Sequence, residues 1–251
     1  MTSRRRAPSL SIAAGSLFEV RRRCSCGLSA HRLPAIKRGL LTRWLAYANL
    51  RQMASTLPFY IRENDPPAKR QILRAAMKLF SERGLDGTSI RDIAKESGYT
   101  NPALYKHFAG KEELALHLFE TCHRRLWTKC HAAIDAAKSF DDKLDAYIGQ
   151  VLALVDEHPD AMAFLSDSAR VLWPRAAAAV RRRTMIGLAR SLMGTAPRSS
   201  RSGRRIQDDV AAASLQGTLA ELTRMLQVGV IHGPAIQWKP EVVALFRKIA
   251  A

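Results

Sequence analysis

The sequence predicts an all-α protein, with a helix-turn-helix toward the N-terminus and a larger helical part behind it. Three observations favour this fold class. The 251 residues include only 14 glycines and 11 prolines, the chain is rich in Ala, Leu and Arg, and it contains no convincing run of alternating β-branched residues. The chain is long enough for one large or two small domains, each with its own core.

Residues 1–52 are strongly basic, with 11 Lys and Arg against the single acid Glu19, a net charge of +10 out of +18 for the whole chain. Three interpretations stay open. The segment resembles an organelle transit peptide in composition, it can be a flexible arm that contacts phosphates, or it can be upstream sequence before a protein that starts at Met53. Because more than half of the excess charge lies here, net charge alone gives weak support for a nucleic-acid-binding core.

The first strong helix begins after Asp65-Pro66-Pro67 and is expected to end at Gly84. Its apolar residues recur at helical spacing and form a single stripe. The stripe consists of Ile72, Ala75, Ala76, Leu79 and Phe80.

The next stretch predicts two short helices joined by a tight turn. Thr88 or Ser89 can cap the first of them, with Asp92 completing an approximate capping box, and Gly98 ends it. The second is expected over residues 101–108, with Pro102 in its first turn. Helices this short cannot bury enough apolar surface to be stable alone, and their usual purpose is to hold the second one against a DNA groove.

The remainder keeps a helical pattern. A long helix begins at Gly110-Lys111-Glu112-Glu113, where two acids suit the helix N-terminus. Its buried face continues through Leu114, Leu118, Cys122, Leu126 and Cys130. Further helices are expected over 141–157, 161–172, 174–193, 205–228 and 240–250, with a loop over 194–203.

Four motifs between Phe80 and Leu114 resemble the DNA-binding domain of the tetracycline-repressor (TetR-type) family of bacterial transcriptional regulators. They are Phe80-x-x-x-Gly84, Thr88-Ser89-Ile90-Arg91-Asp92-Ile93-Ala94, Leu104-Tyr105-x-His107-Phe108 and Lys111-x-x-Leu114. Gly110 departs from the polar cap usual there, and beyond Phe119 the resemblance is architectural only. The implied organisation is a basic, disordered extension (1–64), a helix-turn-helix domain (65–113) and a helical domain for ligand binding and dimerisation (114–251).

Within residues 101–108, Leu104 and Phe108 are four apart and should face the protein. Outward-facing residues then lie where the resemblance implies base-edge contacts, and Asn, Lys, Pro and Ala suit such contacts chemically. They are Asn101, Pro102, Ala103 and Lys106. The resemblance implies mainly phosphate contacts for Thr88, Ser89, Arg91, Thr100, Tyr105, His107 and Lys111. Simpler roles stay open: Tyr105 in the core, His107 and Lys106 solvated, and Arg91 paired with an acid.

The C-terminal part offers candidates for an apolar effector cavity, although such residues can equally be plain core. They are Trp127, Met162, Phe164, Leu165, Trp173 and Met225. The resemblance also implies a four-helix dimer interface built from the last two helices, with intramolecular packing as the alternative. Its candidates are Leu215, Leu219, Leu222, Leu226, Val242, Val243 and Phe246.

Nine arginines and no acid occur between Arg175 and Arg205. This segment can bind an acidic effector or partner, or form a solvated face and loop. No apolar run approaches the roughly 20 residues of a membrane span, and the four cysteines suggest a reducing cytoplasm rather than a disulfide framework. We find no phosphate loop, metal-spaced cluster or nucleophile elbow, so neither an enzyme nor a cofactor or metal is expected.

We therefore expect a homodimeric, ligand-responsive regulator, more a repressor than an activator. It would bind a pseudo-palindromic operator in double-stranded DNA and respond to a largely apolar small molecule. The alternative is a nonspecific nucleic-acid-binding protein that uses the basic N-terminal arm.

Overall fold

The computed structural model describes residues 57–197 and 207–250, and these ranges contain helices, turns and loops but no strand. All of them belong to one compact unit, Tyr47–Ala251. The basic segment 1–52, the arginines between residues 198 and 205 and most of the loop expected over 194–203 lie outside the described residues. The all-α fold class is confirmed for the described part of the chain.

Three helices and the start of a fourth form the first layer: α2 (Pro67–Arg83), α3 (Ile90–Ser97), α4 (Asn101–Tyr105) and α5 (Lys111–Asp135). The stripe predicted on α2 is buried, because it packs against α3, α5 and α7. Gly84 ends α2 with a φ of 72°, a conformation that glycine adopts without the steric cost a side chain would add.

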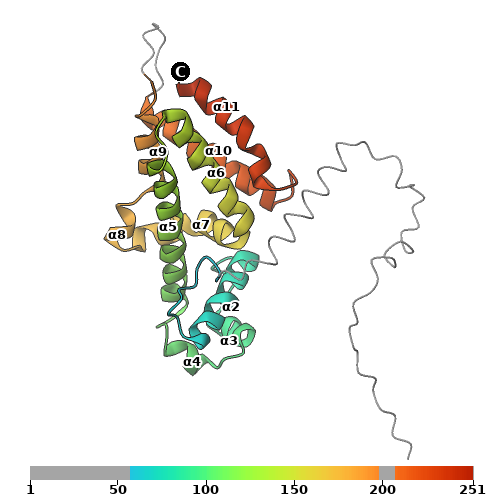
Figure 1. Ribbon diagram of the computed structural model, residues 1–251. Helices are drawn as coiled ribbons and strands as arrows, with labels where there is room; N and C mark the ends of the chain where they lie inside the picture. The colour runs from blue at the N-terminus through green and yellow to red at the C-terminus, as the bar shows by residue number, and fades with distance from the viewer. Residues whose placement is uncertain (1–56, 198–206, 251) are drawn as a thin grey trace, which may run out of the picture. The chain divides into compact units, whose positions relative to one another are not determined.

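Helix α5 is 25 residues long and runs from the helix-turn-helix into the remaining helices (Figure 1). It packs against α2, α6, α7, α8 and α9. The domain boundary expected between residues 113 and 114 therefore falls inside a continuous helix. A displacement of one end of α5 must therefore also move its other end.

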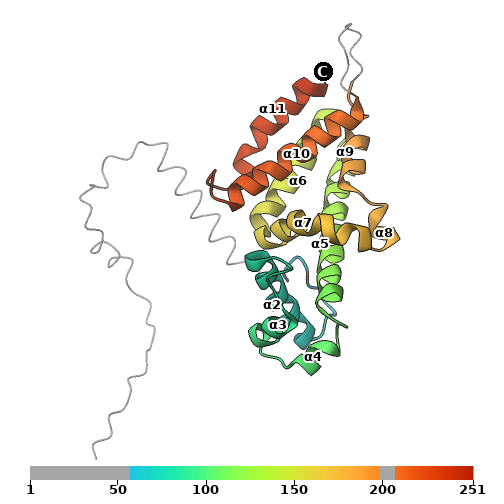
Figure 2. The ribbon, with the colours of Figure 1, turned by 180° about the vertical axis from the view of Figure 1, so that it is seen from behind.

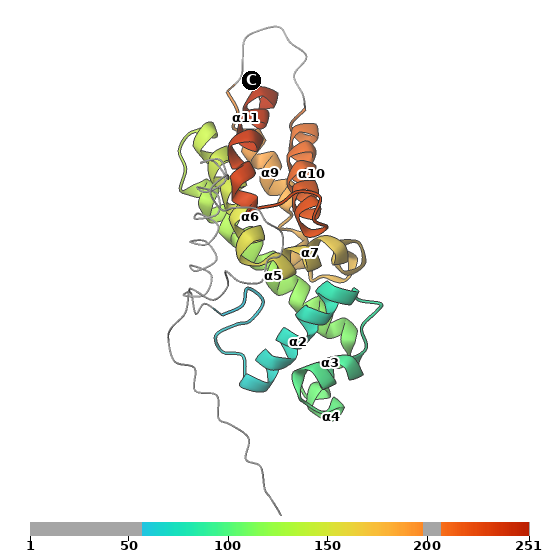
Figure 3. The ribbon, with the colours of Figure 1, turned by 90° about the vertical axis from the view of Figure 1, so that its right-hand side faces the viewer.

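The second layer comprises α6 (Phe140–Glu157), α7 (Pro159–Leu172), α9 (Met185–Met193), α10 (Asp208–Gln227) and α11 (Lys239–Ala250), with the short η4 (Ala235–Trp238) before α11. Helix α10 packs on α9 and α7, and α11 packs on α6 (Figure 2). Helices α10 and α11 also lie side by side (Figure 3).

The single helix expected from Pro174 to Met193 is wrong. The chain instead forms η3 (Trp173–Arg175), α8 (Ala178–Arg181) and α9. One long-range and one local hydrogen bond accompany the break: Glu120 of α5 accepts from the backbone N–H of Ala177 at 2.7 Å, and Thr184 caps α9 by accepting from the N–H of Gly187 at 2.9 Å. The helix cap at Thr184 therefore starts a new helix within residues 174–193, although the composition of this segment favours a single one.

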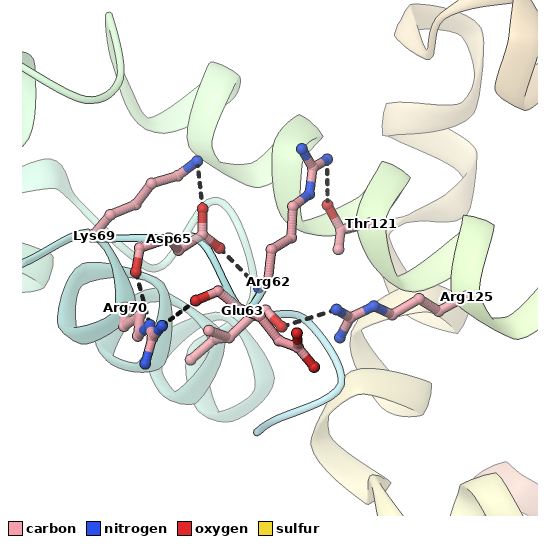
Figure 4. A network of polar contacts seen from close by, with 8 residues as sticks. Arg62, Glu63, Asp65, Lys69, Arg70, Thr121 and Arg125 are labelled. Carbon is pink, nitrogen blue, oxygen red and sulfur yellow. Dashed lines mark hydrogen bonds and ion pairs between the residues drawn. The ribbon is translucent and has the colours of Figure 1, made fainter. Parts of the chain in front are cut away.

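Residues 57–66, which we name the N-terminal strap, correct the expectation that disorder extends to residue 64. Phe59 and Ile61 are buried in the core, and the Phe59 ring stacks on His158 with 4.8 Å between centroids. The Arg125 guanidinium of α5 donates to the carbonyls of Phe59 at 2.6 Å and Ile61 at 2.9 Å, as Figure 4 shows for the surrounding network. The strap thus fastens the start of α2 to the middle of α5.

The cap of α3 leads to a first prediction. The Ser89 hydroxyl accepts from the Asp92 N–H, and the Asp92 carboxylate accepts from the Ser89 N–H, so the predicted capping box is confirmed. We expect Ser89→Ala to lower the free energy of unfolding by about 1 kcal/mol in urea titrations. Ser81→Ala, in the last turn of α2, removes a hydroxyl with no capping role. Equal effects of the two changes would contradict the assignment.

Candidate nucleic-acid interface and ligand cavity

The turn between α3 and α4 is built from local signals. Gly98 has a φ of 74°, in the left-handed region, and its N–H bonds back to the carbonyls of Ala94 and Lys95. Thr100 then takes an extended conformation before α4, with Pro102 in the first turn. Ile93 and Leu104 are fully buried and hold the two helices on α2 and α5. The geometry is that of a helix-turn-helix.

Helix α4 ends at Tyr105, three residues before the expected end at Phe108. The reason is that the Leu104 carbonyl accepts from the N–H groups of both His107 and Phe108, which tightens the chain into a turn. Leu104 and Phe108 nevertheless both face the core, as the spacing predicted. The short helix leaves Tyr105 and Lys106 at its exposed end.

Most of the predicted DNA-contacting side chains reach the surface. Tyr105 is 53% exposed, which excludes the core role left open for it. Pro102 and Lys106 are exposed on the same short segment, and Asn101, Ala103 and His107 are partly exposed there. Ser89, Arg91 and Thr100 are exposed on or beside α3. A continuous outward surface therefore follows α4 and the first turn of α3.

Two side chains that were predicted to contact DNA form hydrogen bonds within the protein. Thr88 is only 2% exposed, and its hydroxyl donates to the carbonyls of Gly84 at 2.9 Å and Leu79 at 3.3 Å. The Lys111 ammonium donates to the Leu85 carbonyl at 2.8 Å. Thr88 is thus a structural residue that closes the α2–α3 loop, which corrects its assignment as a surface contact.

A surface hollow of about 570 Å³ lies between the α2–α3 loop and the start of α5. It brings together Ser89, Tyr105 and Lys111, which come from three different elements, with Gly110 at the N-terminus of α5. Hydroxyl groups, an ammonium and backbone N–H groups at a helix N-terminus are the groups that contact phosphates. Asp86, Asp92 and Glu112 line the same hollow. Ser89, Tyr105, Lys111 and the N-terminus of α5 can therefore contact a phosphate beside α4, whereas the carboxylates would repel one that filled the hollow.

A second cavity of about 400 Å³ opens among α5, α7, the α8–α9 junction and α10. Its lining is mostly apolar and aromatic, with a few polar side chains. The residues are Phe119, His123, Leu126, Val151, Met162, Leu165, Ser166, Ala169, Trp173, Thr184, Met185, Ile186, Gln216, Leu219, Ala220 and Thr223. Such a volume and composition suit a small molecule.

Three of the six predicted cavity residues, Met162, Leu165 and Trp173, line this cavity. The other three are not among the lining residues. Phe164 stacks on Phe80 of α2 with 5.7 Å between centroids, Trp127 lies under the Arg183 guanidinium, and the Met225 carbonyl ends α10 by accepting from Val230. The sequence reasoning missed Phe119 and His123, whose i, i+4 spacing on α5 was the available signal.

His123 has an unusual setting in this cavity. Its ring lies 5.0 Å from that of Trp173 and stacks on Phe119, and its Nδ1 is buried with no hydrogen-bond partner among the described residues. Burial lowers the pKa of His123 to about 4, so the imidazole is neutral at pH 7. A neutral imidazole can donate or accept one hydrogen bond from a ligand but cannot balance a charge.

This pKa leads to a second prediction. The unfolded chain takes up a proton at His123 near pH 6.5, whereas the folded chain resists it until about pH 4. The stability contributed by the neutral form is present above pH 6.5 and is lost as the pH falls. We expect the free energy of unfolding to fall by about 1 kcal/mol more in the parent than in His123→Phe between about pH 7.5 and 5.5. His232→Phe, at an exposed histidine, is the control and should retain the parental pH dependence.

The predicted dimer stripe faces inward. Leu215, Leu219, Val242, Val243 and Phe246 are buried within the single chain, and only Leu222 and Leu226 are partly exposed. Intramolecular packing, the alternative left open, therefore accounts for the first five. The apolar side chains exposed on these helices are instead Val210 (53%) and Leu245 (47%).

Among the described residues, no cluster of His, Cys, Asp or Glu has an arrangement that could hold a metal ion. Within the same ranges no helix combines the length and apolar character needed to span a bilayer.

Comparisons with known proteins agree with this geometry. A model described as "Bacterial regulatory proteins, tetR family" matches residues 72–118. The chain is 28% identical over 102 residues to the HTH-type transcriptional repressor KstR2 of Mycobacterium tuberculosis, covering 41% of this chain and 51% of that protein. It is 33% identical over 84 residues to the probable HTH-type transcriptional regulator ArpR of Pseudomonas putida, covering 34% and 38%. The chain thus spans about half the length, or less, of these curated relatives.

Solved structures share the fold over a longer range. The ketosteroid transcriptional regulator KstR2 of Mycobacterium tuberculosis has a TM-score of 0.64 at 20% identity, covering 77% of this chain and 97% of that one. FadR of Bacillus subtilis, in complex with stearoyl-CoA, has a TM-score of 0.56 at 16% identity, covering 71% and 97%. At these identities the likeness is one of fold. The family model identifies residues 72–118 as a DNA-binding segment of the tetR family of bacterial regulatory proteins, and the curated relatives that the chain resembles are transcriptional regulators.

Proposed function

We propose that the protein is a sequence-specific, ligand-responsive transcriptional regulator, acting as a repressor in the cytoplasm, and not an enzyme. The observation that carries this proposal is the exposed surface of the helix-turn-helix. Tyr105, Pro102 and Lys106 project from a short helix that is held in place by the buried Leu104. A short helix presented in this way is the element that such motifs place in the major groove.

Asn101, Pro102, Ala103 and Lys106 would meet base edges, and Ser89, Arg91, Thr100, Tyr105 and His107 would position the phosphate backbone. Lys111 is engaged with the Leu85 carbonyl but still lines the hollow beside Tyr105. It would reach a phosphate while keeping that bond, because an ammonium has three donors.

The protein would act as a homodimer, so that two α4 helices enter successive major grooves of a pseudo-palindromic site. The proposed interface uses the outward faces of α10 and α11. Val210 and Leu245 are exposed there, and neighbouring residues of α10 such as Ala213 and Gly217 are small enough for close helix approach. This face replaces the inward stripe that the sequence indicated.

The effector would bind in the cavity beside α5. One structural relative is a ketosteroid transcriptional regulator, and another was solved in complex with stearoyl-CoA. Both classes of molecule have a large apolar body, which agrees with the lining of this cavity. Because α5 carries Phe119 and His123 at the cavity and begins at Lys111 beside α4, a ligand that moves α5 would change the spacing of the two α4 helices.

The test begins with selection of binding sites from a random pool of DNA duplexes by the full-length chain. Fluorescence anisotropy then compares the selected site with a scrambled duplex at two salt concentrations. We expect a two-fold symmetric site and a preference of about 10³-fold or more. Equal, steeply salt-dependent binding to both duplexes would instead favour the alternative of a nonspecific binder that uses the basic residues 1–52. Deleting those residues should then abolish binding.

A further inference from the structure

The cavity and the segment beside its rim differ in charge. None of the cavity-lining residues is an Asp, Glu, Lys or Arg. The chain leaves the lining at Trp173 and returns to it at Thr184, so residues 174–183 border the cavity at both ends. This rim segment carries four exposed arginines: Arg175, Arg181, Arg182 and Arg183.

These four guanidinium groups are not neutralised by the described part of the chain, where no carboxylate lies within ion-pair distance of them. The nearby acid, Glu120, accepts instead from the backbone N–H of Ala177. Arg183 lies over the Trp127 ring, 5.1 Å from its centroid. The rim segment is therefore anchored on α5 at two points while its cationic groups stay available.

The interior of the cavity cannot accommodate a charged group. Moving an ion into an apolar site without a counter-charge costs several kcal/mol or more, and the one titratable side chain of the lining, His123, is neutral at pH 7. The charged group of a ligand must therefore stay at the mouth of the cavity, in contact with solvent. The exposed Ile186, which also lines the cavity, marks where the lining reaches solvent, two residues after Thr184 and the rim segment.

We propose that the effector is an amphipathic anion, with its apolar body in the cavity and its anionic group bound by Arg181, Arg182 and Arg183. Guanidinium groups bind carboxylate, sulfate and phosphate oxygens through paired N–H donors, so this site selects for negative charge and tolerates different oxyanions. This inference rests on the proposed effector role of the cavity, but not on the proposed DNA contacts.

The test uses three probes with the same twelve-carbon tail: dodecanoate, dodecanol and dodecyltrimethylammonium. Isothermal titration calorimetry of the full-length chain, below the micelle concentration, measures each Kd. We expect dodecanoate to bind at least about tenfold more tightly than either of the others, as several partly exposed charge contacts would give. The variant Arg181→Gln/Arg182→Gln/Arg183→Gln should lose this advantage and bind dodecanol as the parent does.

Two controls separate the site from general adsorption. Ala169→Trp fills the cavity and should weaken both dodecanoate and dodecanol, whereas Lys138→Gln/Arg247→Gln/Lys248→Gln removes three cations elsewhere and should weaken neither. Unchanged dodecanoate binding in the rim variant, equal binding of the cationic probe, or no binding of any probe would overturn the proposal. DNA anisotropy on the same preparations shows whether the DNA-binding function stands independently of that result.

Discussion

Replacing both Tyr105 and Lys106 with alanine is expected to weaken binding to the selected DNA site by about 100-fold. Both side chains are exposed at the end of α4, so the change removes a phenol and an ammonium from the DNA-facing surface without opening a cavity in the core. Surface changes of this kind usually alter the free energy of unfolding by no more than about 0.5 kcal/mol. A loss of DNA affinity would therefore reflect missing contacts to DNA and not a loss of folded protein.

Fluorescence anisotropy on the selected and scrambled duplexes measures this loss, and urea unfolding checks the fold. Lys129→Ala/Val171→Ala removes an exposed lysine and an exposed apolar side chain from α5 and α7, away from α4, and should keep the parental affinity. If the Tyr105/Lys106 variant kept both affinity and site preference, DNA recognition through α4 would be wrong. A uniform loss on both duplexes, with a shallower salt dependence, would assign these residues to phosphates alone.

The helix-turn-helix could be predicted because its signals are local. Ser89 and Asp92 are three residues apart, and Gly98 and Pro102 act on the turn in which they occur, so short-range rules suffice. The N-terminal strap could not be predicted in this way. Arg125 binds carbonyl groups more than 60 residues earlier in the chain, and no periodic pattern connects them.

The C-terminal part shows a second limit of such reasoning. An apolar stripe indicates that a helix face is buried, but not whether its own chain or a second copy covers it. The family resemblance implies a dimer interface for Leu215 and Phe246, and the structure buries both within the chain. The cavity is similar: Met162 and Phe164 are both buried residues of α7, but only the arrangement of the surrounding helices determines that Met162 faces an unfilled space.

Replacing Arg125 with alanine is expected to lower the free energy of unfolding by about 2–3 kcal/mol, because its charged hydrogen bonds to the carbonyls of Pro58, Phe59 and Ile61 are lost. Of these acceptors, only the Pro58 carbonyl keeps another donor, the N–H of Ile61. The strap should then detach from α5 before the protein unfolds. Hydrogen exchange measures this directly, as faster exchange confined to residues 57–66 and the first turn of α2. The strap also carries Arg62, which donates to Thr121 of α5 at 3.4 Å, so its release loosens the hold of α2 on α5 (Figure 4).

Arg124 provides a matched control, since it is the preceding residue of the same helix and is exposed. Arg124→Ala removes the same charge and side chain and should change the free energy of unfolding by less than about 0.5 kcal/mol. Arg125→Lys should be intermediate, because an ammonium keeps the charge but cannot span two carbonyls as the planar guanidinium does. Equal stability of the Arg124 and Arg125 variants would show that the strap does not stabilise the junction. A selective loss in Arg125→Ala would identify the strap as the clamp that sets α2, and with it α3 and α4, against the helix that passes the cavity.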